Sequence, residues 1–464
     1  MTQKNFPLIE DDMPIETTQG TDPPWGVHQT LKNDARFSKV ISWYTNGEAQ
    51  SHAKYDTDQS NLSQLAQGFE YFIDTYYFHY VELKNLTPDT VYYFQCGSNS
   101  TGWSKIHQFQ TAPALPSRGI HFGVYGDCRS NRERRRAVND LIINNGTYFG
   151  TSPEFLLQNG DLVYSGDDME LWRNYALDVE NVSANITIMP IQGNHEFGDF
   201  RQSYYKENFV LPENGNEEWY YSFSWGLAHF TALDSESHGI SPYQAQDLNW
   251  IKEDLELAEN DPTILWKFVY FHQAVFASAS HKERLDIKSH WSPLFEQYGV
   301  DIVFTGHNHF YERSFPVNYM NQYNATGDPD YFDPEYPIYI VTAAAGMGDE
   351  NEVKTRDNAY SAVFNGSSHW CDFNITLDFT TNTTRLELRV IGINNAGTEN
   401  YFIDAINITK PIPTAWFTAT TPADYNHPVT YKRIYITISI VTSLAGLAIV
   451  VTLIIKRRLK HLKS

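Results

Sequence analysis

Short segments in which apolar and polar residues alternate fill the first quarter of the chain. Four of them, separated by turns, span residues 39–44, 76–83, 91–97 and 106–111. A period of two is typical of strands with one buried face, so this pattern predicts an all-β domain in residues 21–115. Residues 1–20 are polar and acidic, and we expect them to be disordered.

From residue 118 to 410 apolar strands alternate with amphipathic helices. Residues 131–143 predict a helix whose basic face, Arg132 to Arg136, we interpret as solvated rather than as a nucleic-acid patch. Residues 242–259 predict another, capped by Ser241 with Pro242 in its first turn. Strands return at 336–343, 371–379 and 386–391. The alternation predicts an α/β domain of two stacked sheets flanked by helices, with the site at the carboxyl ends of strands.

Five apolar runs in this region each end in a cluster of polar side chains. The runs are residues 120–125, 155–157, 186–191, 264–270 and 302–304. One cluster alone would be weak evidence, because a Gly-Asp pair is usually a turn and a buried histidine is usually a core residue. Five in succession predict a metal site, with seven candidate ligands: Asp127, Asp161, Tyr164, Asn194, His272, His307 and His309.

These ligand types indicate which metal ions the site would bind. Carboxylate, imidazole, amide oxygen and phenolate favour iron, manganese or zinc over copper or calcium. Seven ligands are too many for one tetrahedral zinc, whereas they suit two ions that share a bridging carboxylate and promote phosphoryl transfer. His307 and His309 are two residues apart, so an extended segment would project both rings to the same side.

Across residues 120–313 the clusters resemble the motif set of the purple acid phosphatases, within the binuclear metallophosphoesterase superfamily with its calcineurin-like fold. Tyr164, three residues after Asp161, separates this family from most relatives, and Tyr311-Glu312-Arg313 also matches. The resemblance implies hydrolysis of phosphate monoesters on small phosphorylated substrates by metal-activated hydroxide. It implies a ferric ion held by Asp127, Tyr164 and His309, a divalent iron, zinc or manganese held by Asn194, His272 and His307, and Asp161 as the bridge.

Three further residues are candidates for contact with substrate. His195 resembles the family's imidazole that contacts the phosphate or protonates the leaving oxygen, and His281 falls where plant members carry a substrate-contacting histidine. Arg129 departs from the family, which has a glycine at this place. Its guanidinium either anchors the phosphate in a bidentate manner or pairs with an acid of the following helix.

The amino-terminal region carries its own resemblance. Residues 86–92 (Leu-Thr-Pro-Asp-Thr-Val-Tyr) resemble the tyrosine corner of fibronectin type III sandwiches. Such a domain ahead of the catalytic domain is what plant-type purple acid phosphatases show. The alternative is an unrelated all-β insertion.

The carboxyl-terminal region predicts a membrane anchor. Residues 434–455 carry no charge and are numerous enough to cross a bilayer as a helix, after a stalk in residues 411–433. Five basic residues follow in the tail 456–464, against two before the segment, which favours a cytoplasmic tail and a catalytic domain outside the cell or in a lumen. A buried core helix is the alternative.

Glycosylation sequons agree with that orientation. They begin at Asn61, Asn85, Asn99, Asn145, Asn181, Asn185, Asn324, Asn365, Asn374, Asn382 and Asn407. Residues 1–20 contain no apolar signal-peptide region, so a tail-anchored protein that faces the cytosol is the alternative to export.

Composition and charge limit the partners, the disulfides and the functions that the sequence can predict. The formal net charge of −22 argues against binding of nucleic acid. Three cysteines, Cys96, Cys128 and Cys371, do not predict a disulfide, and the oligomeric state is not predicted. A phosphodiesterase or nucleotide hydrolase with the same ions, and a non-catalytic adhesion or receptor ectodomain, are the alternative functions.

Overall fold

The computed structural model describes residues 22–114, 118–144, 149–197, 203–216, 218–236, 245–278, 281, 283–346, 358–394, 399–418, 432–444 and 447–459. Residues 1–20, predicted to be disordered, and the predicted cap Ser241-Pro242 lie outside these ranges.

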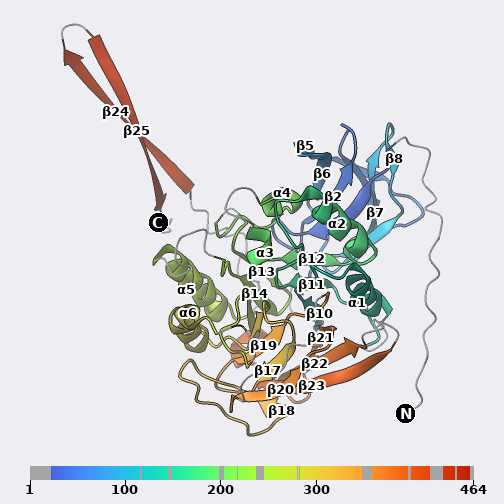
Figure 1. The fold of residues 1–464 in the computed structure, drawn as a ribbon, viewed down its shortest axis with the longest axis vertical. Helices are drawn as coiled ribbons and strands as arrows, with labels where there is room; N and C mark the ends of the chain where they lie inside the picture. The colour runs from blue at the N-terminus through green and yellow to red at the C-terminus, as the bar shows by residue number, and fades with distance from the viewer. Residues whose placement is uncertain are drawn as a thin grey trace.

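Two seven-stranded sheets form the catalytic part of the molecule (Figure 1). The first has the order β12 (Thr187–Pro190), β11 (Phe155–Gln158), β10 (Ile120–Tyr125), β21 (His369–Asp378), β22 (Thr383–Ile393), β23 (Asn400–Pro411) and β18 (Asp330–Phe332). The second has the order β13 (Tyr221–Trp225), β14 (Ala228–Ala232), β15 (Trp266–Tyr270), β16 (Ile302–Thr305), β19 (Ile338–Thr342), β17 (Tyr311–Ser314) and β20 (Ser361–Asn365). The prediction of two stacked sheets is confirmed.

Aromatic rings fill the space between the two sheets. Phe122 of β10 stacks on Phe155 and Phe373 of its own sheet, at ring-centroid distances of 5.4 and 4.9 Å. The same ring meets Phe230 and Phe268 of the other sheet edge-on, each at 5.2 Å. All five are fully buried, and such pairs add to the hydrophobic contribution of their area. The apolar runs that precede the candidate ligands are therefore the core strands.

Helices cover the two flanks (Figure 1). On one flank α1 (Arg132–Asn144) packs on α2 (Met169–Ser183), and on the other α5 (Ala245–Asn260) packs on α6 (Leu285–Gln297). Asp168 caps α2, because its side chain accepts hydrogen bonds from the amides of Glu170 and Leu171. The helices predicted at 131–143 and 242–259 correspond to α1 and α5.

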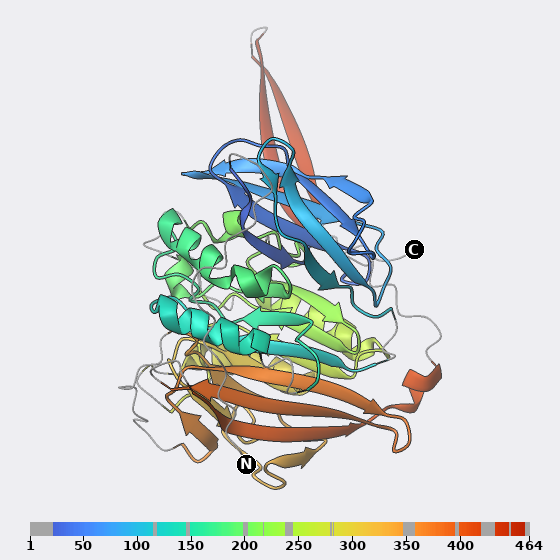
Figure 2. The same ribbon diagram turned by 90° about the vertical axis from the view of Figure 1, so that its right-hand side faces the viewer.

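The amino-terminal domain is a β-sandwich that lies against α2 (Figure 2). One sheet has the order β1 (Trp25–Thr30), β2 (Lys39–Thr45), β6 (Tyr76–Leu83) and β5 (Phe69–Ile73). The other has the order β4 (Gln64–Gln67), β3 (His52–Asp56), β7 (Val91–Ser98) and β8 (Gly102–Trp103), with β9 (His107–Gln110) also paired to β7. The predicted tyrosine corner is present, since the amide of Thr87 donates to the Tyr92 hydroxyl at 3.0 Å.

The carboxyl-terminal apolar segment does not form the predicted helix. It is an antiparallel hairpin of β24 (Lys432–Leu444) and β25 (Leu447–Leu459), drawn apart from the rest of the fold in Figure 1. The segment is rich in Ile, Val and Thr, whose branched side chains favour extended backbone. Among the helices of the described ranges, none is long and apolar enough to cross a membrane.

Candidate metal centre

The candidate ligands follow the carboxyl ends of parallel strands. β10, β11 and β12 pair in parallel in one sheet, and β15 and β16 pair in parallel in the other. The loops that leave these strands therefore meet at one edge. Asp127, Asp161 and His307 each have a left-handed backbone, with φ of 53°, 55° and 69°. Such strain at non-glycine residues is concentrated at functional sites.

Four of the predicted ligands form one tight group. The Oδ1 atom of Asn194 lies 3.1 Å from Nε2 of His272 and 2.9 Å from Nδ1 of His307. Oδ1 of Asp161 lies 3.3 Å from the same Nε2 of His272. Adjacent ligands about 2.1 Å from a six-coordinate ion are about 3.0 Å apart. The spacing of these atoms therefore fits a single cation.

A second group lies on the other side of Asp161. Oδ1 of Asp127 is 3.5 Å from Nε2 of His309. This oxygen is buried and has no hydrogen-bond partner among the described residues. Unpaired buried acceptors are rare in folded proteins, and a cation would satisfy this one. Ligand atoms of Asp127, Asp161 and His272 all lie within 4.8 Å of one another, which fits two ions with Asp161 between them.

The protonation states of these groups also suit cations. Burial lowers the pKa of His307 to about 2 and that of His309 to about 4, and it lowers the pKa of His272 as well. Burial and the neighbouring Asp161 carboxylate raise the pKa of Asp127. Burial opposes ionisation of Asp161, but the electrostatic interactions with His272, His195 and Arg129 hold its pKa below the usual value. Metal ions bind imidazoles in their neutral form, and a bound cation would offset the repulsion between the two carboxylates that raises the pKa of Asp127.

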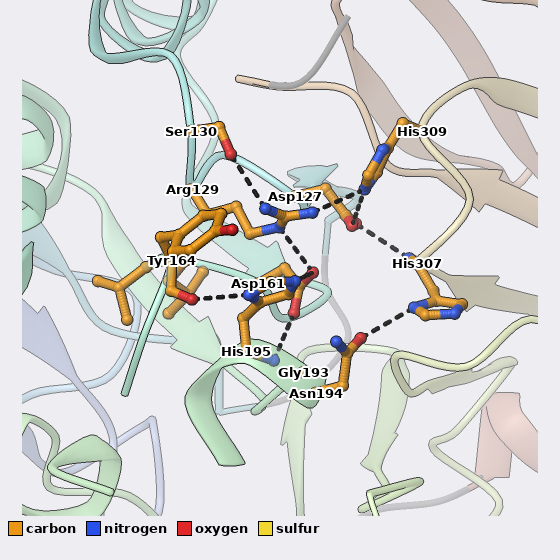
Figure 3. A network of polar contacts seen from close by, with 12 residues as sticks. Asp127, Arg129, Ser130, Asp161, Tyr164, Gly193, Asn194, His195, His307 and His309 are labelled. Atoms are coloured by element: carbon orange, nitrogen blue, oxygen red, sulfur yellow. Dashed lines mark hydrogen bonds and ion pairs between the residues drawn. The ribbon is translucent and has the colours of Figure 1, made fainter. Parts of the chain in front are cut away.

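Tyr164 stands at the rim of this cluster. Its side chain is 59% exposed, and its phenol oxygen makes no hydrogen bond to a described residue. Its ring lies 5.2 Å from the ring of His195 and below the guanidinium of Arg129, at 5.4 Å (Figure 3). The structure thus brings six of the seven predicted ligands into mutual contact and places the seventh beside them.

Arg129 points into the centre. Its Nε donates to Oδ2 of Asp161 at 3.1 Å, and its Nη2 is 3.5 Å from Nε2 of His309 (Figure 3). Nη1 donates to the hydroxyl of Ser130 at 3.0 Å. The alternative that Arg129 pairs with an acid of the following helix is therefore wrong.

Both candidate histidines lie beside the ligands. Nδ1 of His195 is 2.6 Å from the carbonyl oxygen of Tyr164, so this nitrogen carries the hydrogen and Nε2 is left to face the centre (Figure 3). The ring of His281 is 4.5 Å from that of His307 and 6.3 Å from that of His309. The segment between the last two ligands is a bend, so the extended segment predicted there is wrong.

Glu196 is a residue that the sequence interpretation missed. One of its carboxylate oxygens accepts hydrogen bonds from the amides of Asp161 and Gly193, both at 2.7 Å. The other accepts from the amides of Leu162 and Val163, at 2.7 and 2.9 Å. Glu196 therefore fastens the loop after β11 to the loop after β12. Its position directly after Asn194 and His195, in the polar cluster that follows the apolar run 186–191, was the available signal.

The basic face of α1 has a role that the sequence did not predict. Arg132, Arg135 and Arg136 all pair with the buried carboxylate of Asp178 in α2, at 2.8, 2.5 and 2.7 Å. Arg135 itself is buried. This face is therefore partly solvated, as predicted, with Arg132 41% and Arg136 53% exposed, but it is also an interhelical ion cluster.

Comparisons with known proteins agree with this geometry. Residues 24–111 match the amino-terminal domain of purple acid phosphatases, and residues 120–311 match the calcineurin-like phosphoesterases. The chain is 27% identical to acid phosphatase type 7 of Danio rerio over 377 residues, which covers 74% of this chain and 81% of that relative. It is 28% identical to purple acid phosphatase 15 of Arabidopsis thaliana over 318 residues, which covers 60% of this chain and 56% of that relative.

A solved purple acid phosphatase from yellow lupin seeds has the same fold. Its TM-score is 0.68 at 17% identity, over 86% of this chain and 76% of that one. The sheets, the strand-end site and the matches define a calcineurin-like metallophosphoesterase, a phosphoester hydrolase. Within that class, the chain matches the amino-terminal domain of the purple acid phosphatases and is similar to members of that family.

Proposed function

We propose that this enzyme hydrolyses phosphate monoesters at a centre of one ferric ion and one divalent iron, zinc or manganese ion. The observation that carries the proposal is the convergence of Asn194, His272 and His307 on one point, with the buried, unpaired oxygen of Asp127 beyond the shared Asp161. Asp127, Tyr164 and His309 would hold the ferric ion, and Asn194, His272 and His307 the divalent one. Bound cations supply Lewis acidity toward water and the phosphoryl oxygens.

The chain's own residues would then orient the phosphate and move protons. Nε2 of His195 faces the centre, while the carbonyl of Tyr164 fixes the other nitrogen and so the direction of the ring. A protonated His195 can donate to the leaving oxygen. His281, beside the ring of His307, can contact the substrate on the opposite side. Arg129 presents a guanidinium that matches a phosphoryl group, once its bonds to the ligands are exchanged for bonds to substrate.

Metal analysis with a visible spectrum, together with turnover of phenyl phosphate, tests this proposal. We expect about two metal ions per chain, including iron, and a visible absorption band that disappears in Tyr164→Phe, since phenolate binding to ferric iron produces charge transfer. Asp161→Asn should lower kcat by at least about 100-fold, because the bridging carboxylate is lost. His290→Gln, on the exposed face of α6, is the control variant.

Three results would contradict the proposal. An iron-loaded protein without a visible band would remove the ligand role of Tyr164. Faster hydrolysis of bis(p-nitrophenyl) phosphate than of phenyl phosphate would favour a phosphodiesterase. Unchanged turnover in Asp161→Asn would favour a non-catalytic ectodomain.

We also propose that residues 434–455 anchor the protein in the cell membrane, where this segment would span the bilayer as a helix in place of the hairpin, with the catalytic domain outside or in a lumen. The uncharged segment and the basic residues after it support the anchor. Among the sequon asparagines that the structure describes, six are exposed, which supports the orientation: Asn61, Asn85, Asn99, Asn181, Asn324 and Asn382. We expect the native protein to stay with membranes in alkaline carbonate and to lose mass with a glycosidase. Release by carbonate with no change in mass would contradict this topology.

A further inference from the structure

Three aromatic rings form a cluster at one end of the first seven-stranded sheet. Phe379 lies in the turn between β21 and β22, and Trp416 and Phe417 lie in the 3-10 helix η2 (Thr414–Thr418). The ring centroid of Trp416 is 5.7 Å from that of Phe379 and 5.3 Å from that of Phe417. Phe379 is 53% exposed and Phe417 is 47% exposed. Exposed apolar groups that gather in one place usually mark a surface that another group covers.

The aromatic cluster lies at the opposite edge of the sheet from the metal centre. β21 runs antiparallel to β10, and Ile375 near the end of β21 pairs with Ile120 at the start of β10. The turn after β21 therefore lies beyond the amino end of β10, whereas Asp127 follows its carboxyl end. Thr383 pairs with Pro411, which brings η2 to the same end of the sheet (Figure 2). The proposed hydrolysis therefore does not explain the cluster.

The turn that carries Phe379 also carries a glycosylation sequon. Asn382 follows Phe379 by three residues, and Thr383 and Thr384 complete the sequon. No other sequon of the chain has an aromatic residue three positions before its asparagine. Asn382 is exposed, and its side-chain amide makes no hydrogen bond to a described residue. Its Nδ2 atom is therefore accessible beside the aromatic cluster.

Hydrogen bonds hold this turn against η2 in one geometry. The carboxylate of Asp378 accepts a hydrogen bond from the amide of Thr380 at 2.8 Å. The amide of Ile412, just before η2, donates to the carbonyl oxygen of Asn382 at 2.9 Å. Trp416 packs against the main hydrophobic core and so fixes η2 from below. A group attached at Asn382 would meet a surface that is already ordered, which lowers the entropy lost in the contact.

We propose that Asn382 carries an N-linked glycan whose first N-acetylglucosamine covers the aromatic cluster and stabilises the fold. The glycan is the occupant that the geometry favours, because its attachment point and Phe379 share the turn at residues 379–382. The C–H groups on one face of a sugar ring can pack on an aromatic face, with dispersion attraction and burial of apolar surface. The inference rests on the proposed topology, in which the catalytic domain enters a lumen.

The modification requires a lipid-linked oligosaccharide as co-reactant. Nδ2 of Asn382 bonds to the anomeric carbon of N-acetylglucosamine, and the amide nitrogen loses one proton. The bond from that carbon to the diphosphate of the lipid carrier breaks, and the diphosphate leaves with the electron pair. Transfer to the chain before it folds gives access to Thr384, which is buried in the folded protein.

The first measurement is the occupancy of the site. Mass spectrometry of the peptide that contains residue 382, from protein isolated from native membranes, should show an attached glycan. If other sequons carry glycans and Asn382 is bare, this inference fails and the proposed topology stands. If no sequon carries a glycan, both fail.

The second measurement is the stability of the full-length, glycosylated protein in urea. Asn382→Asp removes the glycan and keeps a residue that tolerates the left-handed backbone found here, with φ of 55°. We expect the equilibrium constant for unfolding to rise about fivefold, the usual effect of losing one aromatic contact. An endoglycosidase that leaves only the first N-acetylglucosamine should not change it. Asn61→Asp is the matched control, because Asn61 is exposed and the residue three positions before it is Asp58.

Phe379→Leu separates the ring contact from the general effect of a glycan. In this background Asn382→Asp should change the unfolding constant by less than about twofold, because leucine offers no ring face. Fivefold changes in both backgrounds, or an equal change in Asn61→Asp, would show a glycan effect that does not need the rings and would overturn the inference. An unchanged constant in Asn382→Asp would overturn it as well.

The outcome of this test does not depend on the catalytic proposal. Unfolding and glycan mass are measured without turnover, so an inactive protein still gives a result. Turnover of phenyl phosphate should be the same in Asn382→Asp, Phe379→Leu and the wild type, because the turn lies at the opposite edge of the sheet from the metal centre.

Discussion

At the scale of single residues, the centre depends on side chains that hold ligands without being ligands. Glu196 is the foremost of them, because its two oxygens accept four backbone hydrogen bonds from the loops that carry Asp161 and Asn194. It is fully buried, as is Asp161. Such partners fix the orientation of ligands, and their loss typically weakens metal binding by an order of magnitude or more.

We therefore predict that Glu196→Gln loses metal and stability together. A glutamine has one acceptor oxygen, so at least two buried amides lose their partner, at about 1–3 kcal/mol each. Urea unfolding and metal content after dialysis measure both effects. Glu154→Gln is the control, because Glu154 pairs with Arg118 at 2.7 Å before β11, at the opposite end of that strand from the centre. Wild-type metal content in Glu196→Gln would show that the four bonds do not position the ligands.

At the scale of elements, the strands before the ligands were predictable from sequence and the loops after them only in part. Apolar runs such as residues 120–125 have to be buried, and their order places Asp127 and Asp161 at neighbouring strand ends. The bend at His307, with its left-handed backbone, depends on the acceptor offered by Asp127 to its amide at 3.1 Å. A contact between residues this distant in sequence cannot be read from a local pattern.

The role of the segment after the last predicted ligand also depends on contacts with residues distant in sequence. Tyr311-Glu312-Arg313 was recognised as a family motif without a role. In the structure Tyr311 and Arg313 donate to Asp404 of β23, at 2.7 and 2.5 Å, and Glu312 accepts from the amide of Ser278 at 2.7 Å. The motif thus joins the two sheets directly behind His309. The ion cluster on the basic face of α1 was not predictable for a related reason, because its partner Asp178 lies on another helix.

At the scale of the whole molecule, the amino-terminal domain is built into the catalytic domain. Nζ of Lys39 donates to the hydroxyl of Thr187 in β12 at 2.5 Å, and the hydroxyl of Tyr44 donates to Asn208 at 2.5 Å. Thr30 donates to the carbonyl of Val210 at 2.6 Å. All three donors are buried. The β-sandwich therefore stabilises the catalytic sheets, and the two domains should unfold together.

This interface also makes the protein sensitive to acid. His28 of β1 is buried among the rings of Tyr44, Phe78 and Phe209, the last from the catalytic domain, and its Nε2 has no hydrogen-bond partner among the described residues. Burial lowers the pKa of His28 to about 4. An unfolded histidine titrates near 6.5, so the unfolded chain binds more protons between these values. The contribution of His28 to the free energy of unfolding is therefore complete above pH 6.5 and is lost as the pH falls toward 4.

We predict that His28→Phe unfolds less readily than the wild type when the pH is lowered. From the shift in pKa, the wild type loses about 2 kcal/mol at this residue between pH 7 and pH 5, and phenylalanine cannot titrate. The free energy of unfolding in urea at the two pH values gives the loss for each protein. Metal release at pH 5 affects both proteins and cancels in the difference, and His290→Gln controls for an exposed histidine. If both proteins lose the same free energy, His28 is not charged on unfolding and the interface is not the source of acid sensitivity.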